Sequence, residues 1–182
     1  MNIKIAAIFG ILLFPTLALS QSHCHKGEVT YFSCQTTQTE KVISICGSVI
    51  SDEPADDSWL QYRFGRIGKI ELTYPIQKKG STQKFEGIHF NRYSVASLRF
   101  INNKTLYEVS ESMGHEDEDS HEQTLSSSGV TVLFNKTKWL NMNCKKFDYG
   151  RQISSFTQLV ISLGHQNGKT DFLSDFNNKI SK

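Results

Sequence analysis

The densest group of side chains that could do chemistry lies between residues 115 and 121, where two imidazoles accompany four carboxylates. Histidine nitrogen suits zinc or copper, and carboxylate oxygen suits harder cations. The candidate metal ligands are His115, Asp117, Asp119 and His121. The segment lacks the glycine and the spaced ligands of an EF-hand loop. A solvated acidic loop explains the same composition, and this alternative stays open.

No motif in the chain identifies a catalytic nucleophile. The Gly-x-Ser-x-Gly elbow of α/β-hydrolases is absent from the sequence, and cysteines held in disulfides supply no thiolate. The serines at 126–128 fit a flexible approach to the strand that begins at Gly129. Glycoside hydrolysis needs two carboxyl groups at a defined separation in space, and the sequence identifies no such pair. We therefore expect no catalytic residue and no cofactor.

The stretch from Trp59 to Pro75 predicts a β-hairpin whose register can be derived. With residues 66–68 as the loop, six large apolar side chains fall on one face, and a one-residue slip would mix the two faces. Gly68 provides the left-handed conformation that the last position of such a loop requires. The predicted pairs are Gly65–Lys69 beside the loop, then Phe64–Ile70, Tyr62–Leu72 and Leu60–Tyr74 on the apolar face, and Arg63–Glu71 and Gln61–Thr73 on the other.

The tip of this hairpin is the candidate binding site. Arg66 and Ile67 place a cation beside an apolar side chain, which has little structural purpose on an exposed tip. A loop held on a rigid hairpin is a good place for recognition. The alternative is a tip buried against helices at the C-terminus. We interpret Arg63 and Glu71, by contrast, as a cross-strand ion pair worth about 0.2–1 kcal/mol.

Residues 1–20 have the pattern of a secretory signal peptide. Lys4 precedes an apolar run over residues 5–19, and Ala18 and Ser20 are small residues before a cut ahead of Gln21. The run is shorter than the roughly 20 residues of a membrane span, and no later segment resembles one. We expect residues 21–182 to form one periplasmic or secreted domain. The formal net charge of +2, with scattered cations, gives no reason to expect a nucleic-acid partner.

All four cysteines follow the signal segment, which predicts two disulfides in an exported chain. Four cysteines allow three pairings, and the sequence alone does not choose among them. We favour Cys24–Cys46 with Cys34–Cys144, because Cys34 and Cys144 lie on strand faces with apolar neighbours. In theory, closing a loop of about 110 residues also removes the most chain entropy. His23 and His25 flank Cys24. They could form a weak metal chelate, or they could belong to a frayed N-terminus.

Alternating apolar residues predict three further hairpins. The first joins residues 28–34 to 41–48, the second spans 94–110 around an Asn102-Asn103 turn, and the third joins 129–134 to 139–144. Asn102-Asn103 would pair Phe100 with Thr105 and Leu98 with Tyr107. In the third, one face carries Val130, Val132, Phe134, Leu140, Met142 and Cys144. Residues 51–58, 76–92 and 111–128 read as loops, the second with a short strand at 84–90 and the third as a mobile loop.

Beyond Cys144 the apolar spacing changes from two residues to three and four. It predicts an amphipathic helix over residues 153–163, ended by Gly164, and a shorter helix that begins at Thr170 or Asp171. Strands followed by helices indicate an α+β fold that is mainly β. We expect an antiparallel sheet of hairpins, arranged as a sandwich or a partly open barrel, with a C-terminal helical segment over about residues 150–182.

The order of short motifs resembles a family of exported bacterial proteins whose function is uncharacterised. The motifs span residues 24–146 and are most specific between Leu60 and Pro75. They are Cys24-x-x-Gly27-Glu28, Phe32-Ser33-Cys34, Val42-x-Ser44-x-Cys46, Leu60-Gln61-Tyr62-Arg63-Phe64-Gly65, Glu71-Leu72-x-Tyr74-Pro75, Tyr107-x-Val109, Gly129-Val130-x-Val132 and Cys144. Where that family has a segment rich in glycine and tryptophan, this chain has the acidic 111–128 segment. The resemblance implies bacterial export and a β domain with paired cysteines, and it implies no catalytic residue.

These observations favour an exported, non-catalytic binding protein with a protein partner. An inhibitor or immunity protein that acts on a cell-wall enzyme or toxin fits this plan, and periplasmic lysozyme inhibitors offer an architectural analogy. The alternative function is a metal-binding or hydrolytic periplasmic protein that uses residues 111–121. A third possibility is a structural component of the envelope.

Overall fold

A computed structural model describes residues 21–50, 57–90, 95–112, 126–134, 138–145 and 154–167. The chain is mainly β, as predicted, with two antiparallel sheets and one helix in these residues. An isolated antiparallel bridge between Thr36 and Cys144 joins the two sheets at one point, and the sheets do not close into a barrel. The predicted signal segment and the predicted second helix lie outside the described residues.

The first sheet has four strands in the order β1-β2-β3-β4. They are β1 (Val29–Gln35), β2 (Val42–Gly47), β3 (Leu60–Arg66) and β4 (Lys69–Tyr74). The second sheet has five strands in the order β5-β6-β7-β8-β9, entered through the short 3-10 helix η1 (Ser81–Lys84). They are β5 (Glu86–Phe90), β6 (Val95–Asn102), β7 (Thr105–Ser112), β8 (Ser127–Phe134) and β9 (Lys138–Asn143).

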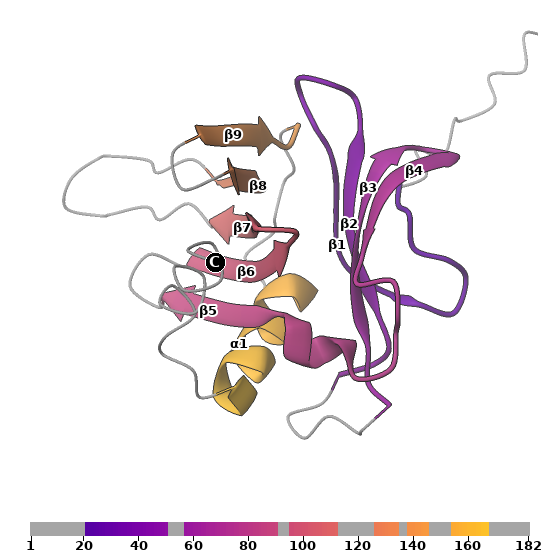
Figure 1. Cartoon of the computed structure of the whole chain (residues 1–182), viewed down its shortest axis with the longest axis vertical. Coiled ribbons are helices and arrows are strands. Elements are labelled where there is room, and N and C mark those ends of the chain that lie inside the picture. The colour runs from indigo at the N-terminus through magenta and orange to yellow at the C-terminus, as the bar shows by residue number, and fades with distance from the viewer. Residues whose placement is uncertain are drawn as a thin grey trace, which may run out of the picture.

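The core lies where the inner faces of the two sheets meet the helix α1 (Ser155–Asn167). Figure 1 shows the sheets facing each other, with α1 near β5, β6 and the start of β1. Aromatic rings form the contact between the sheets. The Tyr62 ring lies 5.0 Å from that of Phe100, which stacks on Tyr107 at 4.8 Å and on Tyr74 at 4.7 Å. Phe156 of α1 packs on Phe32 of β1 at 5.1 Å.

The β3–β4 hairpin keeps Leu72 and Tyr74 on the predicted apolar face, but it does not keep Ile70 there and does not have the predicted register. Arg66 pairs with Lys69 around an Ile67-Gly68 turn, and a bulge beyond Gly65 then aligns Phe64 with Leu72. Gly65 permits the bulge, since a Cβ there would lie 2.4 Å from the Lys69 carbonyl oxygen. The two-residue shift keeps Leu72 and Tyr74 on the apolar face because side chains alternate with a period of two. Ile70, on the turn side of the bulge, lies opposite Gly65 instead.

The shifted register overturns the predicted pair of Arg63 with Glu71. Arg63 lies opposite Thr73, and Glu71 is the extra residue of the bulge. Glu71 instead forms an ion pair with Lys41 of β2. The predicted Phe64–Ile70 pair is wrong for the same reason, and Ile70 is 41% exposed.

The β6–β7 hairpin turns one residue later than predicted. Asn103 and Lys104 form the turn with φ of 47° and 65°, so both central residues adopt the left-handed conformation that a type I′ turn requires. This register pairs Phe100 with Tyr107 and brings Arg99 to within 3.1 Å of Glu108. The sequence did not indicate it because lysine has little preference for positive φ.

The β1–β2 and β8–β9 hairpins confirm the sequence predictions. Val130 pairs with Met142 and Val132 with Leu140, so these four side chains share a face. β8 begins at Ser127, two residues earlier than predicted. The disulfides are Cys24–Cys46 and Cys34–Cys144, the pairing that the sequence favoured.

Gly164 does not end the helix, contrary to the prediction. α1 continues to Asn167, and Gly164 instead lets it approach β5 closely. A Cβ on Gly87 would lie 2.1 Å from the Val160 carbonyl oxygen and 3.1 Å from the Gly164 nitrogen. Gly164 therefore allows the helix to pack closely on the sheet, and it does not terminate the helix.

Glu111 belongs to β7 and not to the predicted 111–128 loop. Its side chain is 1% exposed and accepts hydrogen bonds from the hydroxyls of Ser154 and Thr157. Ser154 also accepts the Thr157 backbone N–H at 3.0 Å, which caps α1. Burial raises the pKa of Glu111, and the two hydroxyl hydrogen bonds oppose part of that rise. Glu111 thus ties the start of the helix to the second sheet.

Replacing Gly87 with alanine should lower the free energy of unfolding by roughly 1–3 kcal/mol, because the added methyl must displace α1. Urea denaturation followed by circular dichroism measures this change. The exposed helix residue Gln158 provides the control, since Gln158→Ala should shift stability by no more than about 0.5 kcal/mol. Equal stability of Gly87→Ala and the parent chain would contradict the close packing.

Tyr62→Phe should leave stability unchanged or raise it by up to about 1 kcal/mol. The Tyr62 hydroxyl is buried without a hydrogen-bond partner among the described residues, so its removal relieves an unmet desolvation cost. The same cause, burial, raises the pKa of Tyr62. Thermal denaturation compares the two chains. A loss of about 2 kcal/mol or more would indicate that the hydroxyl has a partner after all.

Candidate functional site

The most elaborate polar cluster covers the outer face of the four-stranded sheet. Because Tyr62 and Phe64 face the core, Gln61 and Arg63 face the other way. Small side chains, among them Ser44, continue this face across β2. The N-terminal segment, residues 21–28, lies across it and buries Arg63 to 3% exposure.

A disulfide and several hydrogen bonds hold the N-terminal segment on the sheet. The Cys24–Cys46 disulfide joins it to β2 with Cα atoms 5.3 Å apart. The His23 backbone N–H donates to the Ser44 hydroxyl at 3.1 Å, and Arg63 donates to the His23 carbonyl at 2.8 Å. His23 itself is buried, with its Nε2 atom 3.0 Å from the Gly65 carbonyl oxygen. The segment is thus an ordered part of the fold and not a frayed terminus.

Glu28 is the electrostatic partner of Arg63. The guanidinium donates to both carboxylate oxygens, at 2.6 and 3.0 Å, and the side chains are 4% and 8% exposed. Lys78 adds a third contact at 2.9 Å, and the His25 backbone N–H a fourth at 2.8 Å. Burial alone would raise the pKa of Glu28. The hydrogen bonds from Arg63, His25 and Lys78, with the Arg63 charge, outweigh burial and lower the pKa to about 2.

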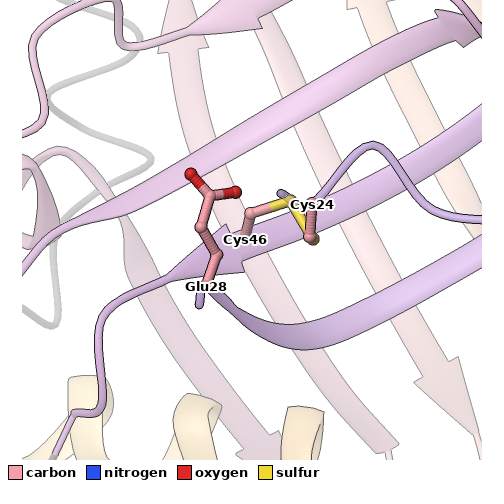
Figure 2. Close-up of side chains that lie close together, drawn as sticks. All are labelled: Cys24, Glu28 and Cys46. Atoms are coloured by element: carbon pink, nitrogen blue, oxygen red, sulfur yellow. A yellow bond between two sulfur atoms is a disulfide. The ribbon is translucent and has the colours of Figure 1, made fainter. Parts of the chain in front are cut away.

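This cluster contains one group with the spacing of metal ligands, and its chemistry excludes a metal. Cys24, Glu28 and Cys46 bring their ligand atoms within 4.8 Å of one another (Figure 2). Both sulfurs are joined in the disulfide, so neither offers a thiolate. The Glu28 carboxylate is already bound by two cations. The arrangement stabilises the N-terminal segment and leaves no ligand set free.

The predicted binding residues lie on an exposed hairpin tip. Arg66 is exposed and Ile67 is 51% exposed, while the next two residues of the hairpin, Gly68 and Lys69, are exposed as well. The tip is at the Val42 end of the first sheet, away from α1 (Figure 1). Among the described residues, burial of the tip against the helix is therefore ruled out.

A groove lies at the opposite end of the same sheet. It has a volume of about 570 Å³ between the start of β1, the residues after β2 and one side of α1. Its lining is mostly apolar and includes Tyr31, Ile50 and Leu159. The Tyr31 hydroxyl donates to the Ser48 carbonyl at 2.7 Å and accepts the Ile50 N–H at 2.9 Å. The Tyr31 hydroxyl, a polar group in the lining, is thus already hydrogen-bonded to the backbone of the protein itself.

The predicted metal ligands His115, Asp117, Asp119 and His121 lie outside the described residues. The structure describes the strands on either side of them, which end at Ser112 and resume at Ser127. Of the two histidines flanking Cys24, His25 is exposed, whereas His23 is engaged as described above. The metal-binding hypothesis for residues 111–121 stays a prediction.

Comparison with known proteins found no matching family model, no matching curated protein and no matching solved structure. Within the described residues, no helix has the length and apolar character needed to span a membrane. The two disulfides are compatible with an oxidising location outside the cytoplasm.

The Glu28–Arg63 cluster was missed in the sequence analysis, although a signal existed. Arg63 stands between Tyr62 and Phe64, and its face of the sheet carries serine and cysteine in place of charged residues. A face of small side chains with one arginine indicates that something covers it and that an acid balances it. Glu28 is 35 residues away, so spacing along the chain did not identify it.

Acid should remove the stabilisation that Glu28 provides. Its pKa is about 2 in the folded chain, against an ordinary value of 4.5. The stabilisation is therefore complete above pH 4.5, and it disappears as the pH falls towards 2. It amounts to roughly 3 kcal/mol for a shift of this size. Glu28→Gln should be less stable than the parent at pH 7, and the difference should shrink by this amount near pH 2.

Urea unfolding at several pH values between 2 and 7 measures this difference. Glu71→Gln is the matched control, because Glu71 also contacts a lysine but lies on the exposed face. Its effect should change much less over the same pH range. If the difference in the free energy of unfolding between the parent and Glu28→Gln stays constant with pH, the carboxylate charge is not what stabilises Arg63.

Proposed function

We propose that this chain is an exported, non-catalytic binding protein that recognises a protein partner through the β3–β4 tip. Its location is the periplasm or the outside of the cell. The partner class that fits best is a cell-wall enzyme or toxin, which the chain would inhibit or neutralise. The exposed cation and apolar side chain on the tip, Arg66 and Ile67, carry the proposal.

The composition of the tip favours recognition over solubility. Ile67 is 51% exposed and Ile70 is 41% exposed, although nothing in the part of the chain that the structure describes requires apolar side chains there. Arg66 and Lys69 stand beside them and are also exposed. The nearby acid, Glu71, is paired with Lys41. The tip therefore presents an apolar surface inside a positive field, which suits an acidic partner surface.

The scaffold beneath the tip is preorganised, which reduces the entropy lost on binding. Gly65 and Gly68 have φ of 151° and 80°, so the bulge and the turn both use conformations that suit glycine. On the outer face, Arg63 of β3 binds His23 and Glu28 of the N-terminal segment, which the Cys24–Cys46 disulfide fixes to β2. A rigid hairpin can thus hold Arg66 and Ile67 in one arrangement.

Cell-wall glycosidases offer a complementary target. They carry two carboxyl groups about 5–10 Å apart in a substrate cleft. A narrow hairpin tip with an arginine at its end can enter such a cleft and pair with a carboxylate. This reasoning, together with the resemblance to exported bacterial proteins with paired cysteines, supports an inhibitor or immunity role.

Ile67→Asp should weaken inhibition without affecting folding, because Ile67 is half exposed and contributes little to the core. The assay measures the lysis of purified peptidoglycan by a panel of lysozymes and other peptidoglycan hydrolases, with increasing amounts of the chain. For a hydrolase that the parent inhibits, the variant should raise the inhibition constant at least tenfold, as expected for a hot-spot residue worth about 1.4 kcal/mol or more.

Ile76→Asp is the matched control, since Ile76 is 78% exposed but lies beyond the far end of β4. It should inhibit as the parent does. If Ile67→Asp and Ile76→Asp raise the inhibition constant equally, the tip is not the contact surface. If the parent chain slows none of the hydrolases and captures no protein from periplasmic extract, the proposed function is wrong.

A further inference from the structure

In the described structure, α1 contacts two of the four edge strands, and it covers the edge at the start of β1. On β1, the Ser155 hydroxyl donates to the Tyr31 carbonyl at 3.1 Å. On β5, a Cβ on Gly87 would meet the Val160 carbonyl of the helix, so α1 packs on the inner face of this strand. An open edge presents unpaired N–H and C=O groups that attract another strand, so coverage of this kind prevents unwanted pairing.

The β4 edge is protected differently. It carries the bulge at Glu71 and the charged Lys69, and Pro75 follows directly after its last residue. A bulge, a lysine and a proline are all devices that discourage strand addition. Of the four edges, β9 has neither a covering helix nor a bulge or proline among its described residues.

The hydrogen bonds around β9 show which of its backbone groups are open. The Cys144 backbone N–H donates to the Ser128 carbonyl at 2.9 Å. Because backbone groups alternate in direction along a strand, the N–H and C=O groups of the even-numbered residues of β9 point towards β8. The odd-numbered residues point outward, and Asn143 uses its carbonyl to accept the Thr37 N–H at 2.8 Å. Trp139 and Asn141 therefore direct two N–H and two C=O groups away from the sheet.

The side chains of the same strand are unusually apolar for an edge. Trp139 is 57% exposed and Leu140 is 46% exposed, on opposite faces of the strand. Lys138 is the single charge in the strand, and no acid accompanies it. Exposed aromatic and aliphatic side chains beside open backbone groups mark a site of strand pairing.

We propose that β9 pairs with β9 of a second copy of this chain, antiparallel and around a two-fold axis through Leu140. Trp139 of each copy then lies opposite Asn141 of the other, and each of these two pairs exchanges two backbone hydrogen bonds. All four open groups of each strand are satisfied. The two five-stranded sheets become one continuous sheet.

The side chains suit this register. Leu140 meets its own mate in a non-hydrogen-bonded pair, where Cα atoms are about 4.5 Å apart and side chains are closest. Lys138 lies opposite Met142 of the other copy, so the two cations stay apart. A register centred on Asn141 would need the Asn143 carbonyl, which Thr37 already occupies. The strand is thus complementary to itself, which favours a second copy over an unrelated peptide.

The contact is small, because the end of the β1–β2 hairpin stops pairing at Asn143. Only residues 138–142 of each copy can pair, which is below the size of a stable interface. We expect a reversible dimer that forms between roughly 10 µM and 1 mM. This contact is separate from the β3–β4 tip, so it does not depend on the proposed function.

Cross-linking of the full disulfide-bonded chain tests the register. Leu140→Cys should form a covalent dimer under mild oxidation, because its mate lies within the Cα separation of about 4.4–6.8 Å that a disulfide requires. Asn141→Cys is the matched control, as it is equally accessible but lies more than about 7 Å from its mate in this register. Peptide mapping confirms that the two native disulfides persist.

Sedimentation equilibrium provides the second measurement. The parent should show a mass that rises with concentration, and Leu140→Lys should weaken association at least tenfold. Ile76→Lys, at an exposed residue elsewhere, should associate as the parent does. A parent that is monomeric up to 1 mM overturns the proposal. Equal cross-linking of Leu140→Cys and Asn141→Cys, or retention by β9 of an unrelated extended peptide without dimerisation, overturns it too.

Discussion

Tyr62 and Phe100 meet between the two sheets with their ring centroids 5.0 Å apart, and most of the structure follows from the surfaces that they bring together. Each sheet has one apolar face, and neither face can stay in water at an acceptable cost in free energy. α1 completes the burial, with Phe156 and Leu163 fully enclosed. Once the inner faces are fixed in this way, Arg63 must face outward and the N-terminal segment must cover it.

The faces of the strands were predictable, whereas the registers were not. A shift of two residues in a regular strand pair leaves the side chains on the same faces, so the alternating pattern does not distinguish one register from the next. In the two hairpins whose registers were predicted incorrectly, the geometry of the turn determined the register. In one, Gly65 allowed a bulge, and in the other, Lys104 adopted positive φ. The β8–β9 register was predicted correctly because the proposed connection at residues 135–137 places Phe134 opposite Lys138, as observed.

Contacts between distant parts of the chain explain the other differences. Gly164 resembles a helix terminator in sequence, but it faces Gly87, a partner 77 residues earlier that the sequence gives no means of finding. Glu111 resembles the start of an acidic loop, yet it binds Ser154 and Thr157 at the start of α1. The candidate binding tip was predictable because its residues are adjacent. The Glu28–Arg63 pair was not, since burial of a polar cluster depends on which segment covers it.

The Cys34–Cys144 disulfide also affects how the chain responds to proteases. It closes a ring that spans most of both sheets, with its cysteines 110 positions apart. A single cut anywhere inside that ring leaves the two fragments covalently attached, and the strands on either side of the cut can keep their places. The disulfide thus gives the domain tolerance of backbone cleavage, and a nicked molecule would migrate as an intact chain until its sulfurs are reduced.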